Sequence, residues 1–414
     1  ATNDVTTIKP PVDVYFENPL SETSTLMADV TATSYSNDQN AFPSETDAFE
    51  DLLDLRTRKN SVIGELVWSY AKENRTFNAG YRGAFGFLRS DLSGSGVTNV
   101  RTGRQRLYGE YSSRHGSFSY RVSLGAENNM KAGDDGFSRF AFSPTVLLSY
   151  RLNKRNMLRL RLDSETSMPD IQQMSGNKIL IMENFYRRGN AEVHNSTGYQ
   201  SRLIYSYNIP RKLIVQTDAH YNRTAGFLYD AFVQDGDAWY LETRNAHRFS
   251  EAGMNMIVTY IPWKWLRLGV DVSADRQTIK ETSSGEAFSD WFFPVYLNAS
   301  AVWGNWSLSC RQTFGGKMLD GLYRKGLEKV SYLSLTYGWK NWQFGAQCLF
   351  PFYDDKYSNE TVSFAPVRHV TQTNLRTKNR EFGFTISWFF QRGKENNSVK
   401  SLENSDVDSG VFKF

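Results

Sequence analysis

The sequence lacks any long apolar segment that could cross a membrane as a helix. Its mean hydropathy is −0.52, and the longest run without a charged residue, Trp291 to Cys310, contains Pro294, Asn298 and the pair Gly304-Asn305. A transmembrane helix needs about 20 predominantly apolar residues, whereas the apolar residues of this run alternate with polar ones. Two strands joined at Gly304-Asn305 are therefore predicted.

Cysteine and histidine are also scarce, and this limits the chemistry that the chain can carry. Cys310 and Cys348 are too few for a disulfide framework or a four-ligand zinc site, and we expect both to face lipid on strands that are not neighbours. No nucleophile, phosphate-loop or zinc-protease motif occurs. The histidines have no metal-ligand spacing; they are His115, His194, His220, His247 and His369. The sequence predicts no metal site, no cofactor and no catalytic residue, and hence no enzyme.

An excess of charge of one sign is missing too. Lys and Arg number 48 against 44 Asp and Glu, which gives a net charge of +4, and no basic face suited to nucleic acid stands out. Nucleic acid is therefore not an expected partner. The first ten residues have no basic region followed by an apolar one, so we expect any signal peptide to have been removed.

What the sequence does have is a regular alternation of short turns and long polar stretches. Tight turns are predicted at Lys72–Arg75, His115-Gly116, Asn153–Arg155, Pro210-Arg211, Pro262–Lys264, Gly304-Asn305 and Lys340-Asn341. Long loops are predicted at about 89–104, 127–139, 165–197, 224–247, 277–290, 315–328 and 353–379. Short periplasmic turns and long extracellular loops are typical of bacterial outer-membrane β-barrels.

Alternation within the strands supports the same fold. Leu158, Leu160 and Leu162 alternate with Arg159, Arg161 and Asp163, and similar patterns recur along most of the chain. One face of such a strand meets lipid and the other a watery lumen. We therefore predict an all-β, antiparallel transmembrane β-barrel of about 16 strands over residues 25–390, with an N-terminal periplasmic segment, 1–24, and a polar C-terminal tail, 391–414.

The lumen-facing charges are the candidate functional residues, and they could either select a ligand or simply hydrate the lumen. They are Arg121, Arg151, Arg159, Arg161, Asp163, Arg202, Asp218, His220, Arg267, Asp271, Asp275 and Arg311. Aromatic residues make up 14% of the chain, and Trp and Tyr prefer the membrane interface. Tryptophans that flank three successive turns are predicted to form an interfacial girdle: Trp263, Trp265, Trp303, Trp306, Trp339 and Trp342.

Residues 143–175 and 187–221 also resemble a known family, the outer-membrane β-barrel proteins of Bacteroidota that are related to TonB-dependent receptors. Ser143-Pro144, Met168-Pro169 and Gly189-Asn190 stand where that family has its strand, Arg-Pro loop and Gly-Asn-Pro loop. Met168 replaces the usual arginine, and Ala191 replaces the last proline. No plug domain or TonB-box-like segment precedes the first predicted strand.

The resemblance implies a protein of the bacterial outer membrane that admits or binds an external ligand through its loops and lumen. A non-transporting structural or assembly subunit and a passive diffusion porin remain open alternatives. The expected partners are outer-membrane lipid and lipopolysaccharide, together with a surface lipoprotein or another subunit of an outer-membrane complex.

Overall fold

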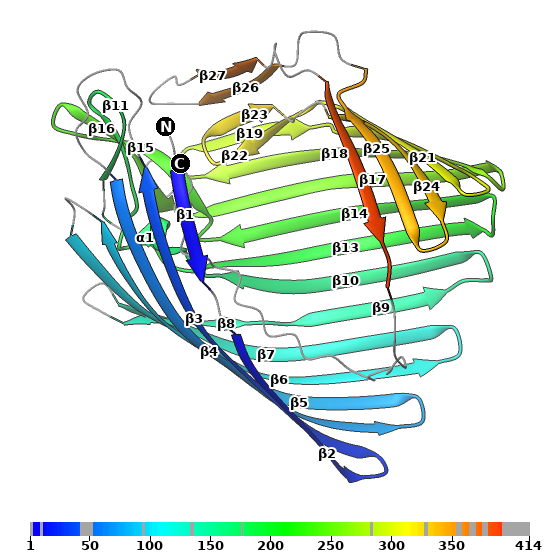
Figure 1. The fold of residues 1–414 in the computed structure, drawn as a ribbon. Helices are drawn as coiled ribbons and strands as arrows, with labels where there is room; N and C mark the ends of the chain where they lie inside the picture. The colour runs from blue at the N-terminus through cyan, green and yellow to red at the C-terminus, as the bar shows by residue number, and fades with distance from the viewer. Residues whose placement is uncertain are drawn as a thin grey trace.

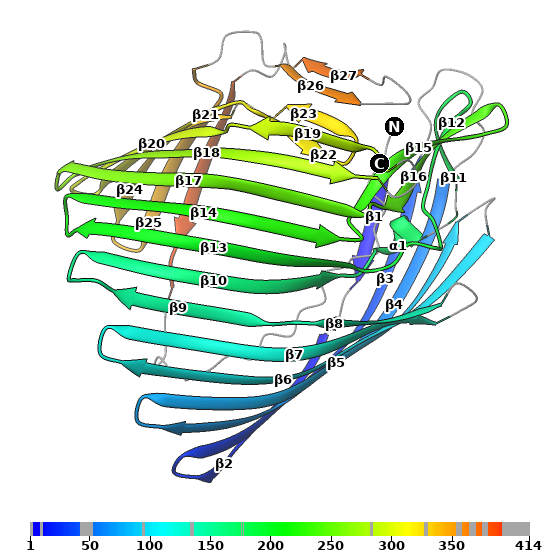
Figure 2. The same cartoon turned by 180° about the vertical axis from the view of Figure 1, so that it is seen from behind.

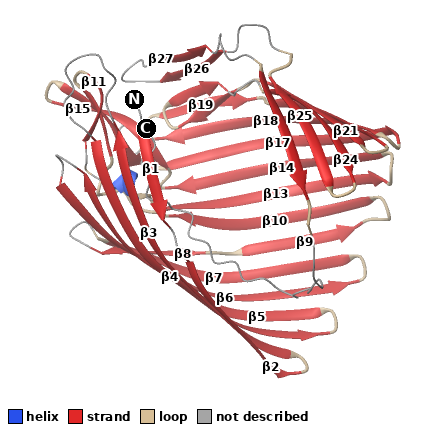
Figure 3. Ribbon diagram, in the orientation of Figure 1, coloured by secondary structure: helices blue, strands red, loops and turns tan. Residues whose placement is uncertain are grey.

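The computed structural model describes residues 3–8, 11–41, 53–92, 96–132, 136–174, 176, 178–281, 285–326, 330–352, 358–363, 370–374 and 380–390. Almost all of them lie in β-strands or in the turns between them (Figure 3). The one helix in these ranges is α1 (Ile171–Met174). No helix within the described ranges is long and apolar enough to cross a membrane. The predicted tail, 391–414, lies outside the described residues.

One antiparallel sheet of 20 strands forms the wall of the molecule (Figures 1 and 2). In the order of pairing its strands are β1 (Asn3–Ile8) and β2 (Pro11–Ser21), β3 (Ser24–Ala41), β4 (Leu53–Lys72), β5 (Arg75–Leu92), β6 (Gly96–His115), β7 (Phe118–Ala132), β8 (Phe137–Phe142) and β9 (Thr145–Arg151), β10 (Asn156–Ser167), β13 (Ser196–Ile209), β14 (Leu213–Ala225), β17 (Arg248–Trp263), β18 (Leu266–Lys280), β19 (Ala287–Phe292) and β20 (Val295–Trp303), β21 (Trp306–Phe314), β24 (Ser331–Trp339), β25 (Trp342–Leu349) and β28 (Glu381–Trp388).

Neighbouring positions of the sheet pair by an antiparallel register, as in a meander. Three pairs of strands, β1 with β2, β8 with β9 and β19 with β20, share a single neighbour and so form one interrupted position each, which leaves 17 positions for the 20 strands. Sixteen of the 17 run from β3 to β28, in agreement with the predicted number. Among the described residues, no pairing joins β2 to β28, the two edges of the sheet.

The seventeenth position corrects the expected start of the barrel. Residues 1–24 were expected to precede it as a periplasmic segment, whereas β2 pairs with β3 from Pro11↔Thr33 to Ser21↔Ser24. The physical reason is visible in the sequence: Val12, Val14 and Phe16 alternate with Asp13, Tyr15 and Glu17, which is the same pattern as in the later strands. An even number of strands therefore no longer supports the barrel, and the support comes from the register and the facing of the side chains.

The tight turns lie where they were predicted, all at one end of the wall. Figures 1 and 2 show this end on the right and on the left, respectively. Two residues separate β17 from β18, β20 from β21, and β24 from β25. Gly304 and Lys340 at two of these turns have positive φ angles, 56° and 51°, which a two-residue hairpin requires.

The six predicted girdle tryptophans surround these turns. Trp303 pairs directly with Trp306, and Trp339 with Trp342, while the rings of Trp263 and Trp265 stack with centroids 5.4 Å apart. All six are between 40% and 57% exposed. Large aromatic side chains that stand open on the outer face beside the turns are what the membrane interface favours.

At the opposite end the chain folds further. A second sheet contains β11 (Lys178–Met182), β12 (Phe185–Arg188), β15 (Leu228–Asp235) and β16 (Ala238–Asn245), and a third contains β22 (Lys317–Asp320), β23 (Tyr323–Gly326), β26 (Ser358–Ser363) and β27 (Val370–Asn374). Both small sheets lie at the end away from the tight turns in Figures 1 and 2. We refer to them together as the loop cap.

Two of the predicted long loops are in fact continuations of strands. β5 and β6 pair as far as Leu92↔Gly96, and β7 pairs with β8 as far as Lys131↔Phe137, so the stretches 89–104 and 127–139 are mainly strand. At 20 residues, β4 and β6 are about twice as long as the 9–11 residues that a tilted strand needs to cross a bilayer. The wall therefore extends well beyond the membrane on the side of the loop cap.

Candidate binding site on the inner wall

The inner face of the sheet carries polar and charged residues in rows, because neighbouring strands pair in register and every second side chain points inward. One row runs Arg202, His220, Gly253 and Asp275 across β13, β14, β17 and β18. Three of the predicted lumen-facing residues thus lie side by side. Asp218, a fourth, is two residues from His220 on β14.

These residues form an ionic cluster around His220, whose side chain is only 6% exposed. The Nδ1 atom of His220 lies 3.1 Å from Asp218 Oδ1, and its Nε2 atom lies 3.1 Å from Asp275 Oδ1. Arg202 Nε is 3.6 Å from the same Asp218 oxygen. A carboxylate oxygen thus lies beside each ring nitrogen of His220. The cluster therefore fixes the orientation of the ring between two strands.

Gly253 allows this arrangement. A Cβ atom at position 253 would lie 1.9 Å from Asp275 Oδ1, so any other residue would displace the carboxylate that contacts His220. The glycine is thus needed here for close approach of a side chain, and not for its backbone freedom.

Two cluster residues were not among the predicted ones. Glu251 Oε1 lies 3.7 Å from His220 Nε2 and accepts a hydrogen bond of 3.0 Å from Asn222 Nδ2. Gln277 Nε2 donates to Glu251 Oε2 at 2.7 Å, and its own side-chain oxygen accepts from the backbone N–H of Leu319 in the loop cap. Glu251 and Gln277 are two residues away from Gly253 and Asp275 on the same strands, so the alternation of side chains along β17 and β18 could have identified both as inward-facing.

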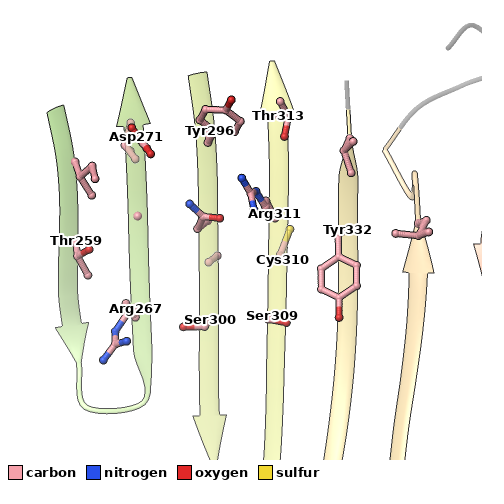
Figure 4. Close-up of a pocket in the computed structure, with 17 residues that line it drawn as sticks. Thr259, Arg267, Asp271, Tyr296, Ser300, Ser309, Cys310, Arg311, Thr313 and Tyr332 are labelled. Carbon is pink, nitrogen blue, oxygen red and sulfur yellow. The ribbon is translucent and has the colours of Figure 1, made fainter. Parts of the chain in front are cut away.

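A depression of about 810 Å³ lies farther along the inner wall, over β17, β18, β20, β21 and β24 (Figure 4). Three predicted residues line it: Arg267, Asp271 and Arg311. Figure 4 shows Arg267 on β18 and Arg311 on β21, with Ser309 on the same strand as Arg311, Ser300 and Tyr296 on β20, and Tyr332 on β24. We call this depression the wall pocket.

The two arginines of the wall pocket are open to a ligand. Both are exposed, and neither forms an ion pair with any residue in the described part of the chain. The guanidinium of Arg311 lies 5.2 Å from the centre of the Tyr296 ring, which holds it by a cation–π contact. Asp271 accepts a 2.7 Å hydrogen bond from Asn255 Nδ2. The pocket thus presents two available cations, hydroxyl groups and aromatic rings to the lumen.

The other predicted lumen residues lie outside both features, although Arg161 on β10 is directly opposite Arg202 of the cluster. Arg121 on β7 approaches Glu110 of β6 at 3.9 Å, and Arg161 pairs with Asp163 on its own strand, β10. Arg151 and Arg159 lie on β9 and β10, outside the cluster and the pocket. Both cysteines are free thiols, and β24 separates their strands. Among the residues that the structure describes, no group of His, Cys, Asp or Glu side chains is placed to hold a metal ion.

The loop cap is held by its own contacts at the end of the lumen. Arg187 pairs with Asp230 at 2.7 Å, and Arg188 pairs with Glu242 at 2.6 Å while its guanidinium lies 4.0 Å from the centre of the Tyr240 ring. These contacts join β12 to β15 and β16. Within the described residues, the loop cap is therefore held together by its own side chains.

A small apolar core fastens the loop cap to the barrel wall. It consists of Tyr229, Ala231, Ala246, Ile279, Leu319 and Leu322, and Phe227, Phe249 and Phe288 pack against it. Ile279, Phe249 and Phe288 belong to the wall strands β18, β17 and β19, and the others belong to the loop cap or its edges. The Tyr229 hydroxyl donates to Glu281 at 2.9 Å, and burial, together with this carboxylate, raises the pKa of Tyr229.

Comparison with known proteins agrees with this architecture. A family model described as "Outer membrane protein beta-barrel family" matches residues 20–388. No curated protein matches the sequence.

Solved structures of outer-membrane receptors have the same fold. The structure titled "Copper transporter OprC" has a TM-score of 0.74 at 11% identity, over 94% of this chain and 66% of that one. The unliganded "ferric citrate transporter FecA" has a TM-score of 0.66 at 8% identity, over 92% of this chain and 61% of that one. "The FrpB iron transporter from Neisseria meningitidis (F3-3 variant)" has 0.59 at 10%, over 88% and 62%. The chain thus spans about three fifths to two thirds of these proteins, and the Bacteroidota assignment stays a prediction.

Proposed function

The chain belongs to the outer membrane protein beta-barrel family, and from this membership we propose that it is a receptor-like barrel that binds an external anionic ligand in the wall pocket and admits it under the loop cap. Its location in the bacterial outer membrane and its structural similarity to TonB-dependent receptors are the background. Binding, transport and the nature of the ligand are the proposal.

The proposal rests on two arginines, Arg267 and Arg311, which line a depression of the inner wall and form no ion pair in the described residues. Arginine presents a planar fork of donors that matches carboxylate and phosphate groups. Structural arginines usually neutralise a neighbouring acid, as Arg202 does with Asp218 in the same wall. Two exposed arginines without such a partner in the described residues are instead available to a ligand.

The loop cap supports a receptor more than a plain pore. Ordered loops with a core of their own offer an external ligand a preformed surface, and preformed sites lose less conformational entropy on binding. A diffusion porin needs only an open lumen, and a structural subunit needs neither a lumen pocket nor available cations. We expect a surface lipoprotein or another outer-membrane subunit, if present, to contact the loop cap.

The test is binding of small polyanions to the purified chain in detergent. Titration calorimetry with citrate and with pyrophosphate should give binding that weakens about tenfold or more in Arg267→Gln and in Arg311→Gln, because each loses a charge-assisted hydrogen bond. Arg151→Gln, a lumen arginine outside the pocket, is the matched control and should bind as the parent does.

Two results would contradict the proposal. Equal binding by the parent and both pocket variants would remove the pocket from the function. Rapid entry of uncharged sugars into reconstituted vesicles, without saturable anion binding, would favour the diffusion porin; neither binding nor flux would favour the structural subunit.

A further inference from the structure

The outer face of the wall carries a second feature, independent of the lumen. An apolar groove of about 650 Å³ runs over β3, β4, β5 and β6, with Val12 of β2 at one side. Its outward-pointing residues follow the strand register in two rows. The lower row is Ala32, Val62, Phe85 and Gly103, and the upper row is Ser34, Asn60, Phe87 and Arg101. We call it the outer groove.

The groove faces lipid and not the lumen. Val62 and Phe85 are 48% and 47% exposed, whereas Ile63, the next residue along β4, is 7% exposed. The row below the groove contains small residues, with Gly64 opposite Gly83. A Cβ at position 83 would lie 3.2 Å from the Phe85 ring and 3.3 Å from the Tyr81 hydroxyl, so these two side chains cover Gly83. An acyl chain can lie in such a groove against side chains that already face the membrane.

Arginines stand immediately above the groove, on the side of the loop cap. The next row of outward positions is Ser36, Arg58, Arg89 and Asn99, so Arg58 and Arg89 are directly opposite each other. Arg101 is their diagonal neighbour, and its guanidinium lies 5.7 Å from the centre of the Phe87 ring. We call Arg58, Arg89 and Arg101 the arginine triad.

The triad has no acidic partner in the parts of the chain that the structure describes. Like charges directly opposite on neighbouring strands destabilise a sheet, so an unoccupied triad would cost stability. All three side chains are exposed. A bound anion removes the repulsion and engages the guanidinium groups in bidentate hydrogen bonds.

The height of the triad identifies the kind of anion. The band of the wall that crosses the bilayer begins at the interfacial aromatic pair of Trp68 and Phe77, 5.8 Å apart, and about ten strand residues span the membrane. Asn60 and Arg58 lie eight and ten positions beyond Trp68 on β4, which is the level of the lipid headgroups on the long-loop side. An anion at that level, with apolar chains directly below it, is a phosphorylated lipid.

We propose that the arginine triad and the outer groove together bind the phosphorylated glycolipid of the outer leaflet, lipopolysaccharide, with a lipid A phosphate on the triad and an acyl chain in the groove. Each guanidinium group can donate two hydrogen bonds to a phosphate, and the apolar groove accommodates the acyl chain. Ser34 and Asn60, which are joined by a 2.9 Å hydrogen bond, lie between the triad and the lower row of the groove and contact the polar glucosamine region. This site would bind the lipid partner that the sequence predicts.

The experiment compares two triple variants that lose the same charge. The first, Arg58→Gln with Arg89→Gln and Arg101→Gln, removes the triad. The second, Arg75→Gln with Arg211→Gln and Lys264→Gln, removes exposed charges at the tight-turn end. Binding of purified bisphosphorylated lipid A to the full chain in detergent is measured by native mass spectrometry. We expect the first variant to bind about tenfold or more weakly and the second to bind as the parent does.

Two further readouts keep the result decisive. Both variants must show the strand-rich circular dichroism and heat-modifiable gel mobility of the parent, and the single substitution Arg89→Lys should retain part of the binding because it keeps the charge but loses the fork. Lipid A whose phosphates have been removed should bind the parent as weakly as it binds the first variant. Equal loss in both triple variants, no loss in either, or undiminished binding of the dephosphorylated lipid would overturn the site.

Discussion

At the end with the tight turns, Lys264 and Trp265 alone join β17 to β18, whereas at the other end the chain between β14 and β17 builds the hairpin of β15 and β16 with buried side chains of its own. The turn end has little to bury, because its tryptophans are matched to the membrane interface. The loop end stands in water and has to bury Tyr229 and Leu322 to stay ordered. The tight-turn end, which lies at the membrane interface, thus needs no core of its own, whereas the loop end, which extends into water, does.

The largest expected effect is an all-or-none difference in accessibility between the two ends. Gly236 lies at the tip of the β15–β16 hairpin, with a φ of 61° and open space around its Cβ position, so an epitope tag inserted there should be tolerated and detected on intact cells. A tag between Asn153 and Lys154, in the turn from β9 to β10, should be hidden. Antibody labelling before and after outer-membrane permeabilisation measures this; after it, both tags should label.

Labelling of the tag at Asn153 on intact cells would reverse the orientation. The loop cap would then face the periplasm, and the proposals for an external ligand and for lipopolysaccharide would both lose their basis.

The next effect concerns packing, and it separates burial in protein from burial in lipid. Leu322 is 1% exposed in the core of the loop cap, so Leu322→Ala should destabilise the cap by about 2–5 kcal/mol. Leu162→Ala, on the outer face of β10, should cost much less because lipid can fill the space. Amide hydrogen exchange in β15, β16, β22 and β23 should rise for the first variant only. An equal effect of the two variants would mean that the cap has no stable core.

A slightly smaller effect is expected from the two faces of a single strand. Leu160→Arg places a charge near the middle of the bilayer and should cost about 2–4 kcal/mol, whereas Arg161→Leu, on the lumen face, should be much milder. Urea unfolding of both variants in lipid vesicles measures the difference. If the two midpoints shift equally, the facing of β10 is wrong.

The same contrast explains how far the sequence could predict the fold. The wall repeats one rule, in which every second residue faces lipid, and this rule assigns Leu160 and Arg161 to opposite faces of β10 without any knowledge of long-range contacts. It failed at β2 because no tryptophan marks that segment and the Glu22-Thr23 turn after it contains no Gly, Pro or Asn, although Val12, Val14 and Phe16 already alternate with other residues. Strand ends are also poorly marked, since β5 and β6 stay paired above the membrane where no lipid selects their side chains.

The inner wall could be predicted only in part. Parity along the strands places Arg202, His220 and Asp275 on one face, but the fact that they meet depends on the register between four strands, and on Gly253, which the Asp275 carboxylate covers. The loop cap was beyond prediction for the same reason: β12 pairs in parallel with β16, which is more than 50 residues away in sequence. No local pattern encodes such a pairing.

The smallest expected effect is a pH dependence at the joint where the 189–195 segment meets the loop cap. His194 Nδ1 lies 2.9 Å from the carbonyl oxygen of Asn195, and Asn245 both accepts from the His194 backbone N–H and donates to its carbonyl oxygen. The ring also packs closely on Gly226, where a Cβ would lie 2.9 Å from its Cε1 atom. Burial lowers the pKa of His194 from its ordinary value of 6.5, and the nearby Arg139 lowers it further against the opposing effect of the Asn195 carbonyl.

A lowered pKa means that the folded joint prefers the neutral imidazole. Its contribution to stability is therefore complete above pH 6.5 and is lost as the pH falls below that value through the lowered pKa. Hydrogen exchange around Asn245 and Gly226, corrected for the intrinsic pH dependence, should accordingly speed up between about pH 7 and about pH 5. His194→Gln should remove this acceleration, while His247→Gln, which changes an exposed histidine two residues from Asn245, should leave it intact. Acceleration that survives in His194→Gln would show that another group loosens the joint. The loop cap would then lack the coupling between the half-buried His194 ring and the Asn245 hydrogen bonds that distinguishes it from the tight-turn end.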